Sequence, residues 1–449
     1  MTHRWKAVIC MALTGILLLS GCSASQGTNP VVKLDKSAAD EWENWGLTPE
    51  FSYEVKAAQP GILVDTQGYE SNGVKTAVLR GKRIPDTFSI VDRSTGQVVY
   101  TGTIQKKENQ NGYAVFSDFT TPGTYRVECM YLGQSYDFAI GDNLYTGHLE
   151  DAIRKLTDSR TPEQGIVLAE EEKSVTESCH FLVKQLQAYE LYGDNILACD
   201  GGAQFLSLLG VEAQWLLTMQ DASGAVYEKV SSMEQELEPE EAMERTAFYS
   251  GVLAKFGYAY RNTDKAFANV CLKASDRAWK YVIKNKLDSG AEELFFAAAE
   301  LYRATGVASY QSYIKAFAQN GLPKAEDMEE VTFYGAVTYL CTKKGADKTI
   351  CASFMKTIST MGEEISLHAR DGAYLTTEED AGEILKDMEV MAVMNHIITN
   401  HEYDTVLENH LHYLLGRNGE NQDLRGEIYR SPKEFAGYLQ LLAAVAATQ

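Results

Sequence analysis

Short apolar segments separated by turn residues fill the stretch from 60 to 145, and this pattern constrains the fold more than any other feature of the chain. The segments are rich in β-branched and aromatic residues, and Gly, Pro, Asn or Asp separates them at intervals of about ten residues. In one segment Tyr125 and Val127 alternate with Arg126 and Glu128, which is typical of a strand with one buried face. The pattern predicts a small antiparallel immunoglobulin-like β-sandwich, a fold that hosts many functions.

From Gly147 onward the composition changes to Ala, Leu, Glu, Lys and Tyr at helical spacing. Breakers such as Gly193-Asp-Asn and Asp288-Ser-Gly divide residues 147–449 into about twelve segments, with no competing strand pattern. The expected helices span 149–158, 175–192, 204–220, 240–260, 265–284, 291–305, 310–319, 328–343, 348–361, 381–399, 405–415 and 432–447. Antiparallel helices with short loops fit hairpins closed into an (α/α)6 barrel, and the pattern alone fits an open helical solenoid equally well.

Residues 1–21 have the features of a targeting segment. Arg4 and Lys6 precede a short apolar run, Ala7–Leu19, and the segment ends in Leu-Ser-Gly followed by Cys22. This ending is similar to a bacterial lipoprotein signal, in which Cys22 is lipidated after cleavage and becomes the first residue. The resemblance implies a protein held by acyl chains on the extracytoplasmic face of the cell membrane. The small and polar residues that follow predict a flexible tether over 22–55, before the sandwich at 56–145.

The chain is strongly acidic, with a formal net charge of −21, or −23 once Arg4 and Lys6 leave with the targeting segment. This charge disfavours nucleic acid and anionic surfaces as partners, and favours a neutral polysaccharide or a cationic partner. The histidines show no metal-ligand spacing, and the six cysteines beyond Cys22 form no Cys-x-x-Cys pair. We therefore expect neither a metal nor a cofactor, and the spacing leaves the disulfide state open.

Six motifs in the first domain occur in a characteristic order: Ile62-Leu-Val, Gly68-Tyr, Lys75-Thr-Ala-Val-Leu, Val99-Tyr-Thr-Gly, Pro122-Gly-Thr-Tyr-Arg and Ile140-Gly-Asp-Asn-Leu-Tyr. Together they resemble the immunoglobulin-like domain that precedes the catalytic domain in many glycoside hydrolase family 9 enzymes, the cellulase-like glucanases. In the helical part, 205–221, 296–306 and Leu411-His-Tyr-Leu-Leu-Gly-Arg-Asn418 are similar to pieces of that catalytic domain. The resemblance implies a sandwich followed by an (α/α)6 barrel of the six-hairpin type.

The resemblance also implies a catalytic pair of carboxylates, in which one protonates the leaving oxygen and the other activates water. The family's base motif, Asp-Ala-Gly-Asp, does not occur between Asp158 and Leu182, and no His follows Asn418 to form the family's His-Arg loop. Asp200-Gly-Gly is better placed on a polar turn before the next helix than at the nucleophilic water. By the same resemblance Arg417 and Asn418 would bind substrate.

The general acid of the family corresponds to Glu434, which opens the last helix in the sequence Ser431-Pro-Lys-Glu. The same residues form a plain helix start, with Ser431 as the cap and Glu434 as the carboxylate of a capping box. A catalytic role and a capping role are both open for Glu434 at this point. Asp194, Asp423 and Glu427 are further carboxylates that could lie at the mouth of the barrel.

Three functions fit these observations. The first is a cell-surface lipoprotein that binds a polysaccharide or oligosaccharide, or serves as a scaffold, through a degenerate catalytic site. The second is an active O-glycosyl hydrolase on β-glucans, with Glu434 as general acid and a relocated base. The third is a structural lipoprotein without a ligand. A cleft lined by aromatic residues would favour the first function, carboxylates facing each other across a cleft the second, and a filled barrel mouth the third.

Overall fold

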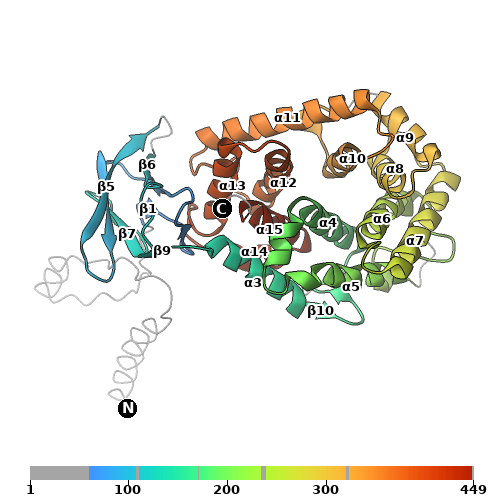
Figure 1. Cartoon of the computed structure of the whole chain (residues 1–449), viewed down its shortest axis with the longest axis horizontal. Helices are drawn as coiled ribbons and strands as arrows, with labels where there is room; N and C mark the ends of the chain where they lie inside the picture. Colours follow the sequence, from blue (N-terminus) through green and yellow to red (C-terminus); the bar gives the residue numbers. More distant parts are fainter. Residues whose placement is uncertain (1–59, 108–110, 170, 234–238, 320–322, 447–449) are drawn as a thin grey trace, which may run out of the picture.

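The structure is a computed structural model, and it describes residues 60–446 apart from 108–110, 170, 234–238 and 320–322. The targeting segment, Cys22 and the whole tether lie outside the described residues. Figure 1 shows a β-domain beside a larger ring of helices. The two parts are joined by a short connection, because strand β9 (Phe138–Gly141) ends just before helix α3 (Leu144–Asp158).

The β-domain is a sandwich whose strands pair antiparallel, apart from one parallel pair at the end of the strand order, and it has a long central strand. The other strands are β1 (Ile62–Leu63), β2 (Tyr69–Glu70), β3 (Thr76–Leu79), β4 (Thr87–Asp92), β5 (Val98–Lys106), β6 (Gly112–Val115), β7 (Gly123–Cys129) and β8 (Gly133–Gln134). Their order is β1-β3-β6-β5-β4-β7-β9-β2, with β8 on β7, and β5 joins the two halves because it pairs with both β6 and β4. The predicted alternation of β7 is confirmed, since Tyr125 and Val127 are buried beneath more exposed neighbours.

Each of the expected helices has a counterpart in the structure. Beyond α3 they are α4 (Val175–Ala198), α5 (Phe205–Thr218), α6 (Pro239–Tyr260), α7 (Lys265–Lys284), α8 (Glu292–Thr305), α9 (Ala308–Gln319), α10 (Glu330–Leu340), α11 (Lys348–Asp371), α12 (Ala381–Ile397), α13 (His401–Leu414), α14 (Arg425–Ile428) and α15 (Pro432–Val445). Helix α14 and a two-stranded hairpin of β10 (Arg160–Thr161) and β11 (Gly165–Ile166) are additions to the prediction. The sequence pattern predicts a second domain without strands, and the hairpin of β10 and β11 shows that this prediction is wrong.

Several helix boundaries differ from the prediction. Helix α4 ends six residues later and α13 begins four residues earlier than expected. Two further differences, at α3 and α11, have a reason in tertiary packing. Helix α3 begins five residues earlier than expected, because the Glu70 carboxylate of the sandwich accepts the Tyr145 N–H at 2.9 Å. Helix α11 runs through Gly362 to Asp371. Gly362 is tolerated inside this helix because α12 comes close there, and a Cβ would stand 2.9 Å from Met394 Cγ.

The helices form a closed ring of two layers, which confirms the predicted (α/α)6 barrel. Helices α4, α6, α8, α10, α12 and α15 lie inside, and α3, α5, α7, α9, α11 and α13 lie outside (Figure 1). The ring closes because the last helix, α15, packs against α4, which an open solenoid would not allow. No helix in the described part of the chain combines the length and the apolarity that a membrane crossing requires.

Candidate functional site

The inner helices begin at one end of the barrel, which we call the mouth. Because inner and outer helices alternate along the chain, the inner ones all run in the same direction. The first turns of α4, α8, α10, α12 and α15 therefore meet at the mouth. These first turns carry acidic side chains in every case: Glu177, Glu292, Glu293, Glu330, Glu383 and Glu434.

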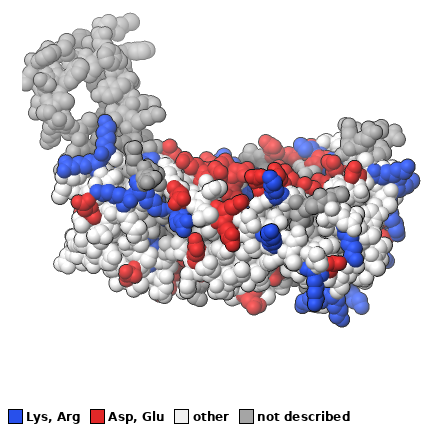
Figure 2. All heavy atoms as spheres, turned by 90° about the horizontal axis from the view of Figure 1, so that it is seen from above, with Lys and Arg blue, Asp and Glu red and all other residues white. Residues whose placement is uncertain are grey.

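Helix stability alone does not require this concentration of carboxylates. A carboxylate near a helix N-terminus interacts favourably with the helix dipole. The same interaction would serve the outer helices, yet α3, α5, α7, α9 and α11 have no acidic residue in the first turn, and α13 is the outer helix that does, with Glu402 and Asp404. Figure 2 shows Asp and Glu gathered in a band along one edge of the helical domain. The carboxylates at the mouth therefore call for a functional explanation.

Glu434 occupies the third position of α15. Ser431 caps this helix as predicted, since its Oγ accepts the Glu434 N–H at 3.3 Å. The other half of the expected capping box does not form, because the Ser431 N–H donates to the Ile428 carbonyl oxygen. The Glu434 carboxylate lies beside Gly382 instead, where an added Cβ would stand 3.5 Å from Glu434 Oε1 and 3.2 Å from Asp380 Oδ1. Capping explains Ser431 and leaves the carboxylate of Glu434 available at the mouth.

Burial raises the pKa of the Glu434 carboxyl, and the negative charges of Asp380 and Glu427 raise it further. A carboxyl with a raised pKa keeps its proton to higher pH than an exposed one, which suits a general acid. Among the described residues, none donates a hydrogen bond to this carboxyl or forms an ion pair with it. Its surroundings are therefore compatible with the acid role that the resemblance implies.

An ion cluster centred on Glu330 occupies part of the mouth. The Glu330 carboxylate lies 2.7 Å from Lys433 Nζ, 3.6 Å from Lys184 Nζ and 3.5 Å from His180 Nδ1. Lys184 also pairs with the buried Glu389. Burial acts to raise the pKa of Glu330, but the positive charges of Lys184 and Lys433 outweigh it and lower that pKa. Glu330 is an ionised and paired carboxylate, so it is not suited to donate a proton.

The sequence does not indicate this cluster, because its members come from three helices that are far apart in the chain. The one available signal was Lys184, a charged residue among the apolar residues of a predicted inner helix. A buried lysine needs a counter-charge nearby, but the sequence does not say which carboxylate supplies it.

Two pockets open at the mouth and meet at Ser431. The smaller, of about 320 Å³, is lined by Glu330, Glu434 and their neighbours. The larger, of about 660 Å³, lies between the segment that precedes α4 and the start of α15. Among the described residues that line the two pockets, Phe181 is the one aromatic side chain. The lining that these pockets offer is polar and charged, and it is not the aromatic-lined cleft that the sequence analysis associates with saccharide binding.

The resemblance places the base in the segment before α4. Some charged residues of this segment form ion pairs and hydrogen bonds that hold the segment in place. Lys173 pairs with Glu212 of α5 at 2.6 Å, and Glu212 also accepts the Ile166 N–H at 2.8 Å. The Glu172 carboxylate accepts hydrogen bonds from the N–H and the hydroxyl of Ser231 at 2.9 and 2.8 Å. Glu172 and Glu212 therefore fix the wall of the larger pocket.

Two other carboxylates of the larger pocket remain open. Glu171 precedes α4, Glu177 lies in its first turn, and both are exposed. Neither carboxylate has a hydrogen-bond donor or a cation as partner in the part of the chain that the structure describes. They are the carboxylates of this pocket that a water molecule or a sugar hydroxyl can reach.

Of the two residues that the resemblance suggests for substrate binding, Arg417 lies in the interface between the two domains and Asn418 lies within the helical domain beside it. The fully buried Arg417 guanidinium donates to Asn409 Oδ1 at 2.8 Å, to Asn409 O at 2.9 Å, to Tyr374 O at 3.0 Å and to Thr76 O at 3.4 Å. Asn418 is also buried and donates to backbone carbonyls. Neither side chain presents a surface to a ligand in this structure, so we assign both to structural support.

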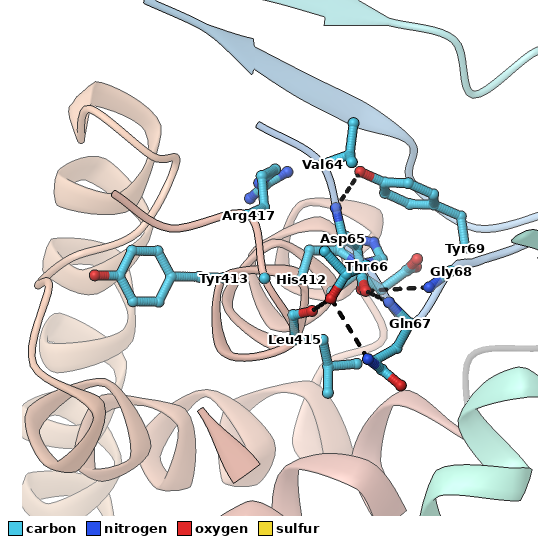
Figure 3. A network of polar contacts seen from close by, with 12 residues as sticks. Val64, Asp65, Thr66, Gln67, Gly68, Tyr69, His412, Tyr413, Leu415 and Arg417 are labelled. Atoms are coloured by element: carbon cyan, nitrogen blue, oxygen red, sulfur yellow. Dashed lines mark hydrogen bonds and ion pairs between the residues drawn. The ribbon is translucent and has the colours of Figure 1, made fainter. Parts of the chain in front are cut away.

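Figure 3 shows how the rest of the same motif joins the domains. His412 Nδ1 lies 2.7 Å from Asp65 Oδ2, and both side chains are fully buried. Asp65 Oδ1 accepts two backbone N–H groups of the turn that follows it. Thr66 donates to the Leu415 carbonyl oxygen from its N–H at 3.2 Å and from its hydroxyl at 2.8 Å. The motif that resembles the family near its cleft here anchors the sandwich to the barrel.

Burial disfavours both charged forms of this pair, so it raises the pKa of Asp65 and lowers the pKa of His412. His412 Nε2 lies 2.9 Å from the Val74 carbonyl oxygen, which requires an N–H at Nε2. The pair is then satisfied by a protonated Asp65 that donates to Nδ1. The contact is a neutral hydrogen bond between the domains.

The remaining candidates lie away from the mouth or are already paired. Asp200-Gly-Gly forms the turn after α4, as predicted, with Gly201 at a φ of 78°. Asp194 lies near the same end of α4, opposite the mouth, whereas Asp423 pairs with Arg425 at 2.6 Å. In the described part of the chain, no group of His, Cys, Asp and Glu residues could hold a metal ion, and Cys129, Cys179, Cys199, Cys271, Cys341 and Cys351 are free thiols.

Comparison with known families matches both domains. Residues 173–424 match the model described as glycosyl hydrolase family 9, and residues 57–134 match the model described as cellulase N-terminal ig-like domain. No curated protein sequence matches the chain.

Solved structures of similar fold include three that the chain covers almost completely. A metagenome-derived glycoside hydrolase family 9 endoglucanase has 20% identity and a TM-score of 0.72, with 86% of this chain and 99% of that chain covered. A thermostable endoglucanase mutant from Alicyclobacillus acidocaldarius has 17% identity, a TM-score of 0.72 and coverage of 86% and 99%. A family 9 protein from Bacteroides ovatus has 16% identity, a TM-score of 0.67 and coverage of 87% and 99%. The match to the family model extends over more than half of the chain, and the sandwich and the closed double ring of helices agree with it, so this protein belongs to glycosyl hydrolase family 9.

Proposed function

We propose that this protein is a lipid-anchored, extracytoplasmic member of the family that binds a saccharide at the barrel mouth without hydrolysing it. The observation that carries the proposal is the state of the carboxylates there. Glu330, Glu172 and Glu212 are each held by cations or by hydrogen bonds, and the segment before α4 lacks the family's base motif. General acid–base catalysis contributes typically about 10²–10⁴-fold, and an acid without a matched base loses much of that rate.

The negative charge of the mouth favours a neutral saccharide over an anionic one. An acidic site repels uronic acids and other anionic saccharides, and it offers many acceptors to the hydroxyls of a neutral one. Two structures of similar fold were determined with a cellobiose-like isofagomine and with cellobiose. A neutral oligosaccharide of the β-glucan type is the ligand that fits both observations.

Binding and hydrolysis can be separated with the purified full chain in a zwitterionic detergent that contains no sugar. We expect calorimetry to detect binding of cellotetraose or of a mixed-linkage glucan oligosaccharide. We expect no release of reducing ends from β-1,4-glucan, mixed-linkage glucan or xyloglucan above a buffer control. Absence of binding to all of these ligands would contradict the saccharide proposal, and would favour a scaffold or a purely structural lipoprotein.

Hydrolysis is the second candidate, because Glu434 has a raised pKa and two open carboxylates line the adjoining pocket. In that case Glu434 would be the general acid, and Glu171 or Glu177 the relocated base. Glu434→Gln would then lower turnover by about 10²-fold or more, as would the Gln variant of the true base. Glu383→Gln is the matched control, since Glu383 lines the smaller pocket but interacts with Lys386. Turnover that survives Glu434→Gln would place the active site elsewhere.

The lipid anchor has its own test. The proposal is supported by the sequence Leu-Ser-Gly-Cys22 at the end of the targeting segment and by the polar residues after it. In the native host, the wild-type protein should sediment with membranes, whereas Cys22→Ser should release it into the soluble fraction. Membrane association that is unchanged in Cys22→Ser would refute the anchor.

A further inference from the structure

The sandwich carries a basic and apolar surface that neither the barrel nor the mouth site uses. Turn 80–86 follows β3, and the turn 130–132 between β7 and β8 packs against it, because a Cβ on Gly81 would stand 2.8 Å from Leu132 Cδ2. Figure 2 shows Lys and Arg gathered at the sandwich end of the molecule, whereas the acidic band lies on the helical domain. We give the name sandwich tip to four exposed residues of these two turns: Lys82, Arg83, Met130 and Tyr131.

The turn between β7 and β8 holds two apolar side chains outward. Cys129 pairs with Gly133 across it, so three residues reverse the chain, and Tyr131 has a positive φ of 70° there. Leu132 packs on the core of the sandwich, whereas Met130 and Tyr131 remain 67% and 56% exposed. Single apolar residues are normal on a protein surface, but two adjacent ones at the end of a turn form a small apolar patch that a partner can cover.

The positive charges of the sandwich tip are not neutralised by the sandwich. Asp86 is the one carboxylate among the described residues of the two turns, and it pairs with Lys106 at 2.7 Å. In the part of the chain that the structure describes, Lys82 and Arg83 form no ion pair, and the Arg83 guanidinium lies over the Tyr131 ring, with Cζ 3.8 Å from its centre. The sandwich tip is therefore a local positive site on a chain with a formal net charge of −21.

The first described residues lie beside the sandwich tip. The Arg80 N–H donates to the Gly61 carbonyl oxygen at 2.9 Å, and a Cβ on Gly61 would stand 3.3 Å from Leu132 Cδ2. Since Pro60 is the first described residue after the tether, an acyl anchor on Cys22 would attach the molecule to the membrane from this end. The inference rests on the anchor proposed above for this proximity, whereas the chemistry of the sandwich tip is independent of it.

A membrane surface matches both features of the sandwich tip. Apolar and aromatic side chains settle at the boundary between headgroups and acyl chains, and Lys and Arg are attracted to anionic phospholipid headgroups. A soluble polyanion would use the two cations but would have no need of Met130. We propose that the sandwich tip rests on the anionic surface of the membrane, with Met130 and Tyr131 at the level of the headgroups and Lys82 and Arg83 against the phosphates.

The test uses the chain from residue 22 onward with Cys22→Ser, so that neither an acyl chain nor the targeting segment contributes. Flotation with large unilamellar vesicles measures binding. We expect binding to an equimolar mixture of phosphatidylcholine and phosphatidylglycerol, weaker binding to phosphatidylcholine alone, and a decline as salt screens the attraction. Lys82→Glu combined with Arg83→Glu should weaken binding to the mixed vesicles by about tenfold or more.

The matched control is Lys343→Glu combined with Lys344→Glu, because this exposed pair follows α10 in the helical domain and gives the same change in net charge. Binding of the control should stay within about twofold of the unsubstituted chain. Met130→Ser should weaken binding by about threefold or more, and it keeps the inference open to refutation if the charge reversal disturbs the fold.

Three results would overturn the inference. The first is an unsubstituted chain that floats with neither kind of vesicle. The second is a control pair that weakens binding as much as the pair at the sandwich tip. The third is binding that Met130→Ser leaves unchanged, which would indicate a site for a soluble polyanion. Vesicle binding by the chain without an anchor, together with a wild-type protein that stays soluble in the host, would refute the lipid anchor and leave the inference standing.

Discussion

Replacing Arg417 with Met should weaken the attachment of the sandwich to the barrel. Met retains the apolar stem of the side chain but removes four hydrogen bonds, and it leaves the Tyr374 carbonyl oxygen and Asn409 Oδ1 without the donor that Arg417 supplies. A hydrogen bond to a charged group contributes about 1.5–3 kcal/mol, but water entry and relaxation recover part of the sum. Each of the two buried acceptors left without a donor costs about 1–3 kcal/mol, so the net loss of unfolding free energy is on the order of 3 kcal/mol.

Equilibrium unfolding in urea, followed by tryptophan fluorescence, measures this loss. Limited proteolysis provides a second readout, since a loosened interface should expose the connection near Asp142 to cleavage. Arg154→Met is the matched control, because the Arg154 side chain is 65% exposed and pairs with Asp151 on the same helix. The control should change stability by less than about 0.5 kcal/mol. A loss below about 1 kcal/mol for Arg417→Met would refute the assignment of Arg417 to domain docking.

Two further predictions concern stability. Burial raises the pKa of Asp65 to about 8, so Asp65 makes the folded state less stable as pH rises from about 4 to 8. The pKa of His412 is lowered, so His412 makes the folded state more stable as pH rises, but only up to about pH 6.5. The unfolding free energy should therefore fall by about 2 kcal/mol between pH 6.5 and 8, and Asp65→Asn should make this fall smaller. Denaturation measured at both pH values tests this, and an unfolding free energy that rises with pH would contradict it. A Cβ on Gly202 would overlap the Ile196 carbonyl oxygen, whereas Gly147 in α3 has no atom within 4 Å of its Cβ position. Thermal melts should show Gly202→Ala destabilised by about 3 kcal/mol and Gly147→Ala stabilised by about 0.5–1 kcal/mol, and equal melting temperatures would contradict this.

Local signals explain why the helices could be predicted from the sequence. The caps Asp264, Asp347, Asp380 and Ser431 each accept a backbone N–H in the first turn of the helix that follows. Such a bond depends on residues within three positions, which the sequence shows directly. At two of the boundaries that differ, those of α3 and α11, a distant residue, Glu70 or Met394, lies against the helix.

The candidate site could be predicted only in part. Glu434 was identified from its place at the start of the last helix, but the direction of its carboxylate depends on α12, which supplies Asp380 and Gly382. The Glu330 cluster joins α4, α10 and α15, and no spacing in the chain indicates it. Arg417 lies in a motif that resembles a substrate-binding element, so the sequence suggests a role in binding. It is buried because the sandwich packs over it, and the sequence does not show that contact.

The sequence by itself determined the family, the sandwich, the helices and the acidic charge, because alternation, helical period and capping are local patterns. Only the tertiary structure decided which charges meet. It placed Glu330 against Lys433 and freed Glu434 from its capping box. Ion pairing and burial depend on distances between side chains from different helices, and those distances exist only once the ring has closed.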